Sequence, residues 1–230
     1  MKRLVLGFII ANMLLNYFVV AQENTQKYYK VKIIQENPEQ KGWGTILIRV
    51  GGFVFNIIAN VVADTDSVKK IARDVENYVN NYGLDQEKVA QEFRGKLKIH
   101  LIKKFQPRKD VYHVGEEITF DIALNQKVYI YLLDISKNDS CLIFPNAKDS
   151  NNIYNINNIE IPANSSYVLK PNEKGRETLY LIASLRPIFF DSFKAKSIYS
   201  CSSRNIGLRK ISKIKNKITS DVSRVDLIIK

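Results

Sequence analysis

The sequence predicts an α+β protein in which a small N-terminal α+β unit precedes a mostly antiparallel, β-sandwich-like domain. Three observations predict this. Apolar residues at helical spacing occur between residues 64 and 93, short β-rich runs dominate after residue 110, and the polar segment Gln106–Asp110, which contains a proline, separates the two parts. We therefore expect residues 22–106 to form the first unit and residues 107–230 the second.

Residues 1–21 have the pattern of an export signal. The basic pair Lys2-Arg3 precedes an apolar run, Leu4–Val20. Residues 19–21 are of the small or modest size that a signal peptidase recognises, so cleavage is expected after Ala21. An uncleaved signal anchor is the alternative, since an apolar run of about 17 residues is at the lower limit for spanning a bilayer. With no cysteine near the cleavage point, we expect an exported, periplasmic or extracellular protein without a lipoprotein anchor.

The first strands of the N-terminal unit are expected to form a hairpin. Thr45–Val50 and Phe53–Ala63 are rich in Ile, Val and Phe, and Gly51-Gly52 supplies a tight reversal between them. A membrane-associated or transmembrane helix over residues 45–63 is the alternative, but Arg49 near its centre would cost about 2.5–3.5 kcal/mol. A weaker alternating run, Tyr28–Ile34, predicts a further strand.

Two helices and a strand complete this unit. Four apolar residues at three- or four-residue spacing predict an amphipathic helix: Val68, Ile71, Val75 and Val79. We expect it to begin with a cap at Asp64–Asp66 and to end before Gly83, and Asp85 to cap a second short helix to about Phe93. A strand with one solvated face follows. Leu97, Ile99 and Leu101 would face the core, and Lys96, Lys98 and His100 the solvent.

The second part is nearly all β. Residues 118–124 predict a strand with one apolar face, whereas residues 128–133 and 177–184 are apolar on both faces, which is typical of central strands covered above and below. The Asn-rich segment 146–158 predicts turns and irregular loop. Residues 222–229 predict a closing strand, and the set of short strands indicates a sandwich or open barrel.

Several landmarks have structural roles of their own. Gly115, before a strand, and Gly175, between two strands, fit turn conformations that a side chain would resist. Pro145 and Pro162 follow Phe144 and Ile161, and proline suits a strand end because it cannot donate a ladder hydrogen bond. Asn146 is expected to fix its turn by bonding to the local backbone.

These landmarks occur in a characteristic order together with five further residues or short segments. These are Tyr112, Ile118-Thr119-Phe120, Tyr129–Leu132, Tyr180–Ser184 and Pro187. In this order they resemble a bacterial domain of unknown function, DUF4384, over Tyr112–Pro187. The resemblance implies a β-sandwich-like module of exported or envelope-associated bacterial proteins, and it implies no catalytic residue.

Cys141 and Cys201 are a candidate disulfide. In an exported protein such a pair would close a loop of about 60 residues and stabilise the fold by about 4 kcal/mol. Two unrelated, half-buried thiols are the alternative, because the sequence does not give the distance between their Cα atoms.

From the sequence we expect a protein without enzymatic activity. A hydrolase is the less favoured alternative. His100 and His113 are the two histidines, and neither belongs to a metal-ligand spacing. Pairing of His113 with Ser184 or with Cys141 would give a nucleophile and a base, but neither has a local catalytic motif. Glu116-Glu117 would point to opposite faces of a strand. We therefore expect no catalytic residue, no metal and no cofactor.

The chain is basic, with a formal net charge of +12, which can attract phosphate, anionic lipid or acidic glycan. The candidate contacts for such a polyanion are Arg204, Arg209, Lys210, Lys213 and Lys217. Lys210, Lys213 and Lys217 would share a helix face; a solvated linker or a helix before the last strand is the alternative. We expect a non-catalytic interaction or accessory module of the bacterial envelope, with another envelope protein as partner, or else a binder of anionic lipid or glycan. No nucleic-acid partner is expected.

Overall fold

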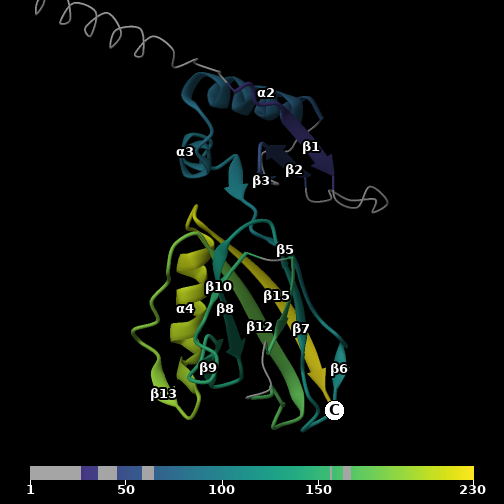
Figure 1. Cartoon of the computed structure of the whole chain (residues 1–230). Helices are drawn as coiled ribbons and strands as arrows, with labels where there is room; N and C mark the ends of the chain where they lie inside the picture. The colour runs from purple at the N-terminus through teal and green to yellow at the C-terminus, as the bar shows by residue number, and fades with distance from the viewer. Residues whose placement is uncertain (1–26, 36–45, 59–64, 156, 163–166) are drawn as a thin grey trace, which may run out of the picture.

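The structure is a computed structural model that describes residues 27–35, 46–58, 65–155, 157–162 and 167–230. The leader predicted for residues 1–21 and Asp64 of the predicted helix cap lie outside these residues. Two units follow each other along the chain, and Figure 1 shows them stacked end to end.

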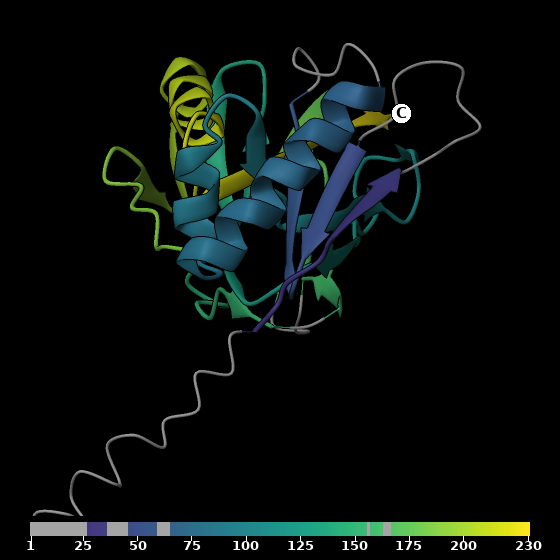
Figure 2. The ribbon, with the colours of Figure 1, turned by 90° about the horizontal axis from the view of Figure 1, so that it is seen from above.

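The first unit is a four-stranded antiparallel sheet with two helices. Its strands follow the order β1-β2-β3-β4, and Figure 2 shows α2 crossing over the strands. The elements are β1 (Val31–Gln35), β2 (Ile46–Val50), β3 (Phe53–Ile57), α2 (Thr65–Tyr82), α3 (Gln86–Glu92) and β4 (Leu97–Ile99). The helix buries the predicted residues Val68, Ile71, Val75 and Val79, so its amphipathic spacing is confirmed.

The predicted hairpin is confirmed over residues 46–57. β2 pairs with β3 in a register that places Leu47 opposite Asn56. Gly51 turns the chain at a φ of 56°, and a Cβ there would lie 2.5 Å from Leu84 Cδ2. No helix in the part of the chain that the structure describes is long and apolar enough to cross a membrane.

The short helix α3 has the predicted cap. The Asp85 carboxylate accepts hydrogen bonds from the amides of Glu87 and Lys88 at 3.0 and 3.1 Å, which satisfies two amides that the first helical turn leaves without partners. Val89 is fully buried. The helix ends at Glu92 and is followed by the C-cap residue Phe93, whose amide donates to the carbonyl of Val89.

The second unit is built from two sheets and one helix. One sheet has eight strands, ordered β13-β14-β9-β8-β12-β15-β6 with β10 also paired to β8, and the other has the order β11-β7-β5. The elements are β5 (Ile102–Pro107), β6 (Val111–Tyr112), β7 (Phe120–Leu124), β8 (Val128–Ile135), β9 (Asp139–Phe144), β10 (Ile153–Tyr154), β11 (Asn157–Ile161), β12 (Gly175–Ser184), β13 (Lys194–Lys196), β14 (Tyr199–Ser203), α4 (Arg204–Lys215) and β15 (Ser220–Ile229).

These elements make three layers, with the eight-stranded sheet in the middle. Figure 1 shows α4 along one face and the strands β5 and β7 along the other. The two-sided burial of β8 is confirmed: Ile130 and Leu132 belong to the core between the sheets, whereas Tyr131 and Leu133 belong to a second core under α4. We call the latter the outer core. The fold class is therefore α+β with sandwich-like sheets.

The landmark residues occupy the expected backbone positions. Gly115 and Gly175 have φ values of 80° and 145°, at which the backbone of a residue with a side chain would be strained. The peptide bonds before Pro145 and Pro162 are both cis. Asn146 Oδ1 accepts hydrogen bonds from the amides of Lys148 and Asp149, so its role in fixing the turn is confirmed.

Two details differ from the sequence prediction. The Asn-rich segment 146–158 is not entirely irregular, because it supplies β10 to the large sheet and the start of β11 to the small one. The strand expected over residues 96–101 ends at Ile99, and β5, which spans the predicted boundary at Gln106, already pairs with β7. The chain therefore passes from the first unit's sheet to the second unit's sheets at His100 and Leu101.

The second difference changes the position of His100. Its side chain does not face solvent but is 15% exposed, with Nδ1 placed 3.4 Å from Asp221 Oδ2 at the start of β15. The alternation of Lys and apolar residues continues through His100, but the chain changes sheets there, so the expected solvated face becomes part of the junction between the units.

Candidate functional site

The predicted basic segment forms α4, which lies on the eight-stranded sheet. The helix buries Gly207, Ile211 and Ile214, and the two isoleucines belong to the outer core. Gly207 permits this close approach, because a Cβ at that position would lie 2.2 Å from Ser140 Oγ on β9. With this side fixed to the sheet, the remaining sides of α4 are left to solvent.

The exposed sides of α4 are strongly basic. Arg204–Lys215 contains five Lys or Arg residues and no Asp or Glu, and Lys217 follows the helix. Arg209, Lys213 and Lys217 are exposed, and their side chains make no ion pair or hydrogen bond with any residue that the structure describes. We call these three residues together with Lys210 the basic face of α4.

The remaining predicted contact, Arg204, lies apart from this face. It is exposed at the start of the helix, and nine residues at 3.6 residues per turn place it on the side opposite Lys213. Lys215 also lies away from the basic face: its Nζ is 5.4 Å from the centre of the Tyr180 ring, which Arg224 also approaches. The structure therefore brings together four of the five predicted residues.

Lys210 connects the basic face to the segment that follows β12. Its Nζ donates a hydrogen bond to the carbonyl of Phe189 and lies 5.3 Å from the centre of the Phe190 ring. Burial lowers the pKa of Lys210, the neighbouring Lys217 and Lys213 lower it further, and Asp191 opposes them. Lys213 and Lys217 therefore lie within electrostatic reach of Lys210.

Phe189 is a surface feature that the sequence analysis missed. Its side chain is 68% exposed, although both of its neighbours are fixed. The amide of Ile188 donates to Tyr131 Oη at 2.8 Å, and the Phe190 ring packs 5.4 Å from Tyr131 and 5.3 Å from Phe193. No local pattern in the sequence indicates this exposure, because it depends on the contacts of Ile188 and Phe190 with Tyr131, which is distant in the chain.

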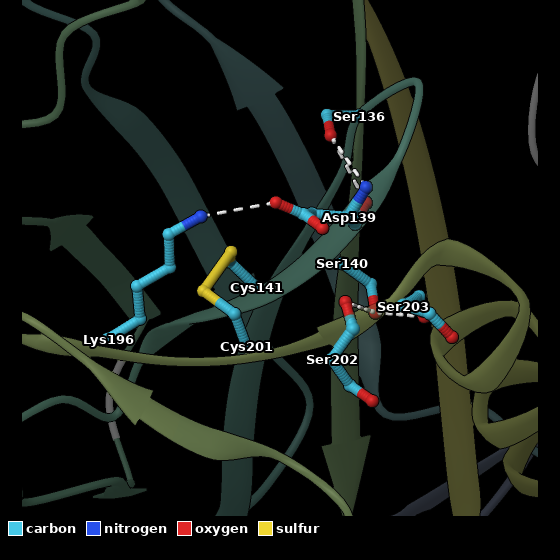
Figure 3. The surroundings of a disulfide bond; sticks show 8 residues. All are labelled: Ser136, Asp139, Ser140, Cys141, Lys196, Cys201, Ser202 and Ser203. Atoms are coloured by element: carbon cyan, nitrogen blue, oxygen red, sulfur yellow. Dashed lines mark hydrogen bonds and ion pairs between the residues drawn. A yellow bond between two sulfur atoms is a disulfide. The ribbon is translucent and has the colours of Figure 1, made fainter.

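Cys141 and Cys201 form a disulfide that joins β9 to β14 (Figure 3). The two residues lie directly opposite each other in the sheet, with Cα atoms 4.1 Å apart. The adjoining Ser140 Oγ donates to the carbonyl of Ser203, the residue before α4. The disulfide therefore ties the start of the helix to the sheet.

The residues considered for nucleophilic catalysis do not meet as pairs. Ser184 Oγ lies 3.1 Å from Ser220 Oγ, Cys141 is in the disulfide, and His113 Nδ1 lies 3.6 Å from Glu116 Oε2. Within the described ranges, no group of three His, Cys, Asp or Glu residues is placed to hold a metal ion.

Asp134 on β8 and Glu177 on β12 are a half-buried acidic pair that the sequence analysis did not single out. Burial raises the pKa of Asp134 to about 7, with a further contribution from Glu177. Asp134 lies directly opposite Cys141, and its Oδ1 has no hydrogen-bond partner among the described residues. Asp134 follows a run that is apolar on both faces of the strand, and a single carboxyl there matches no helical or catalytic pattern in the sequence.

The two units also enclose an open groove of about 770 Å³. Its walls come from α3 of the first unit and from the residues that follow β12, and Arg186 and Glu87, which form an ion pair, both line it. Gln86 lines the groove and accepts a hydrogen bond from Gln126 at 2.8 Å. The groove and these contacts belong to the junction between the units.

Comparison of the chain with curated proteins and with solved structures gives no match. A comparison with family models does give one, and it agrees with the resemblance seen in the landmark residues. The matched segment runs from β6 to just beyond β12 and includes Gly115, Pro145, Pro162 and Gly175. Residues 111–187 match the model of the family described as a domain of unknown function, DUF4384.

Proposed function

We propose that the protein is a non-catalytic interaction module of the bacterial cell envelope, and that the basic face of α4 is its contact surface for an anionic partner. The envelope setting rests on the leader pattern of residues 1–21 and on the setting that the resemblance of residues 111–187 to DUF4384 implies. The contact surface rests on the geometry of α4.

The observation that carries the proposal is that cations gather on one face of α4, a helix without an acidic residue. Several cations elsewhere are paired: Lys69 with Asp66, Lys109 with Glu116, Arg186 with Glu87, and Arg224 with Asp226. Arg209, Lys213 and Lys217 have no such partner in the described part of the chain. Cations gathered on one face without counter-charges raise the local positive potential, which favours an anionic surface.

The positions of the candidate nucleophiles support a non-catalytic function. Ser184 Oγ is engaged with Ser220 and with the carbonyl of Thr219, and His113 is placed beside Glu116. A hydrolase based on His113 would require one of these contacts to be replaced by a nucleophile–base pair.

The test is binding of a defined polyanion, poly-L-glutamate, to the full chain and to a Lys213→Gln/Lys217→Gln variant. The matched control is Lys70→Gln/Arg73→Gln, which removes two exposed charges from α2 instead. We expect the α4 variant to bind more weakly, the control to bind as the unchanged protein does, and all binding to fall between about 0.05 M and about 0.5 M salt. Equal binding by the two double variants would refute the α4 surface.

A further inference from the structure

We propose that the anionic partner is a lipid bilayer, and that Phe189 and the basic face of α4 together form the surface that docks on it. This inference rests on the proposed function, because it uses the same four basic residues. It adds an apolar anchor and thereby the class of partner.

The anchor is an aromatic side chain that the fold holds in solvent. Phe189 is 68% exposed, while Ile188 and Phe190 on either side are tied to Tyr131 by a hydrogen bond and a ring contact. The backbone of this segment is therefore fixed, and little conformational freedom is lost when the ring enters another phase. An aromatic ring presented in this way is suited to the boundary between headgroups and acyl chains.

The anchor and the charges are neighbours in the fold. The carbonyl of Phe189 accepts the hydrogen bond from Lys210 Nζ, so the backbone that carries the anchor lies beside the first lysine of the basic face. Lys213 follows one turn later on the same side of the helix, and Lys217, just past the end of α4, lies within electrostatic reach of Lys210. Ile206, one turn before Lys210, adds a second exposed apolar side chain, at 38%.

This combination favours lipid over an acidic protein. Long lysine side chains can place their ammonium groups among lipid phosphates while an adjacent aromatic ring enters the interfacial region. Membrane attachment of peripheral proteins needs such a pairing of signals, since one weak apolar anchor or a few charges alone bind only marginally. An acidic protein surface would be satisfied by the charges and has no need of an exposed Phe189. One acidic residue, Asp191, lies within electrostatic reach of Lys210, and its side chain is exposed.

The test uses co-sedimentation of the full chain with two kinds of vesicle: phosphatidylcholine alone, and phosphatidylcholine mixed with phosphatidylglycerol. Four proteins are compared: the unchanged chain, Phe189→Ala, Lys213→Gln/Lys217→Gln, and Val114→Ala. Val114 is the control for Phe189, because it is also an exposed apolar residue but lies at the Gly115 turn. Any contribution from Leu4–Val20 is common to all four proteins and cancels in the comparison.

We expect binding to the mixed vesicles to exceed binding to phosphatidylcholine alone. Each lost lysine should weaken that binding about fivefold, and Phe189→Ala should weaken it about tenfold. Val114→Ala should leave it unchanged. Circular dichroism of each variant will show whether the fold is retained, and a Phe189→Leu variant, which keeps an apolar anchor, should restore most of the binding.

The outcomes separate this inference from the proposed function. If Phe189→Ala binds mixed vesicles as the unchanged chain does, or if mixed vesicles are bound no better than phosphatidylcholine, the bilayer inference is overturned. Should poly-L-glutamate still bind in a manner that depends on Lys213 and Lys217, the proposed function stands and the partner is an acidic protein or glycan. Loss of both kinds of binding overturns both proposals.

Discussion

His100 Nδ1 lies 3.4 Å from Asp221 Oδ2, and this contact joins the segment between the two units to the start of β15. The same carboxylate oxygen accepts hydrogen bonds from the amides of Leu101 and Ile102 at 3.0 and 3.1 Å. Asp221 therefore contacts nitrogen atoms of three consecutive residues, at the point where the chain leaves β4 and enters β5. One carboxylate fixes the backbone that connects the units.

Asp221→Asn should destabilise the protein at pH 7. Asn cannot offer a charged acceptor to these groups, and a hydrogen bond to a charged group contributes about 1.5–3 kcal/mol, so we expect the free energy of unfolding to fall by about that amount. Urea denaturation measures it. Asp226→Asn is the control, because this carboxylate is in the same strand but is exposed in an ion pair with Arg224, and its loss should cost less than about 1 kcal/mol.

The Asp221 contact also predicts a dependence on pH. Burial raises the pKa of Asp221, but the hydrogen bonds from His100, Ile102 and Leu101 outweigh it and hold the pKa below its usual value. A carboxyl with a depressed pKa stabilises the fold above its unfolded value, about 3.9, and this contribution is lost as the pH falls through the folded value. Below about pH 4 the unchanged protein and Asp221→Asn should converge in stability; a constant difference between them would contradict the assignment.

Asp134 predicts the opposite trend. Its pKa is raised to about 7 by burial and by Glu177, so the fold is favoured at low pH and loses stability as the pH rises from about 4 to about 7, by at most about 1.4 kcal/mol per pH unit. Asp134→Asn should remove this slope and raise the free energy of unfolding at pH 8. Urea denaturation of both proteins at pH 5 and pH 8 checks it, and an unchanged slope would show that Asp134 is not the group responsible.

Removal of the disulfide should cost stability without changing the fold. The bond joins residues that are 60 apart in sequence, and loss of a constraint of this length costs about 4 kcal/mol. We expect Cys141→Ser/Cys201→Ser to unfold at lower urea concentration, and the unchanged protein in reductant to match it. Reductant should not change the unfolding of the double variant. If reductant changes the urea midpoint of neither protein, the disulfide does not contribute to stability.

Gly207→Ala tests the contact between α4 and β9. A methyl group at residue 207 would meet Ser140 Oγ and Cβ at 2.2 and 2.3 Å, and overpacking of this kind costs about 1–3 kcal/mol. This exceeds the gain of up to about 1 kcal/mol expected from replacing glycine in a helix. Ser140→Gly should therefore rescue Gly207→Ala in a double-mutant cycle of thermal unfolding, and the absence of such coupling would mean that α4 is not seated as closely as described.

The sequence allowed prediction of the elements whose residues have a strong local pattern. The alternation in residues 128–133 predicted a strand covered on both faces, and the structure places Tyr131 and Leu133 against the outer core for that reason. His100 was misplaced because its local pattern continues across a change of sheet, which only long-range pairing decides. Whether residues 204–217 form a helix was left open, since Gly207 weakens the helical pattern and its reason is the proximity of Ser140, far away in sequence.

The candidate site was predictable to a similar degree. Lys210 and Lys213 share a side because helical spacing is a local property, and Arg204 is excluded by the same geometry, whereas Lys217 lies just past the end of the helix. Phe189 was not predictable, because its exposure follows from the way Tyr131 holds the neighbouring residues. Asp134 escaped notice because its unusual environment is created by strands that are distant in the chain.

The place of β15 in the large sheet has a consequence for how the protein acquires its shape. This last strand is inserted between β12 and β6, and it pairs with all ten residues of β12. Residues 111–187 therefore contain a central strand that has an open edge until residues 220–229 are added. During vectorial synthesis the sheet cannot close before its C-terminal residues arrive. We expect the native state to form after the chain is released.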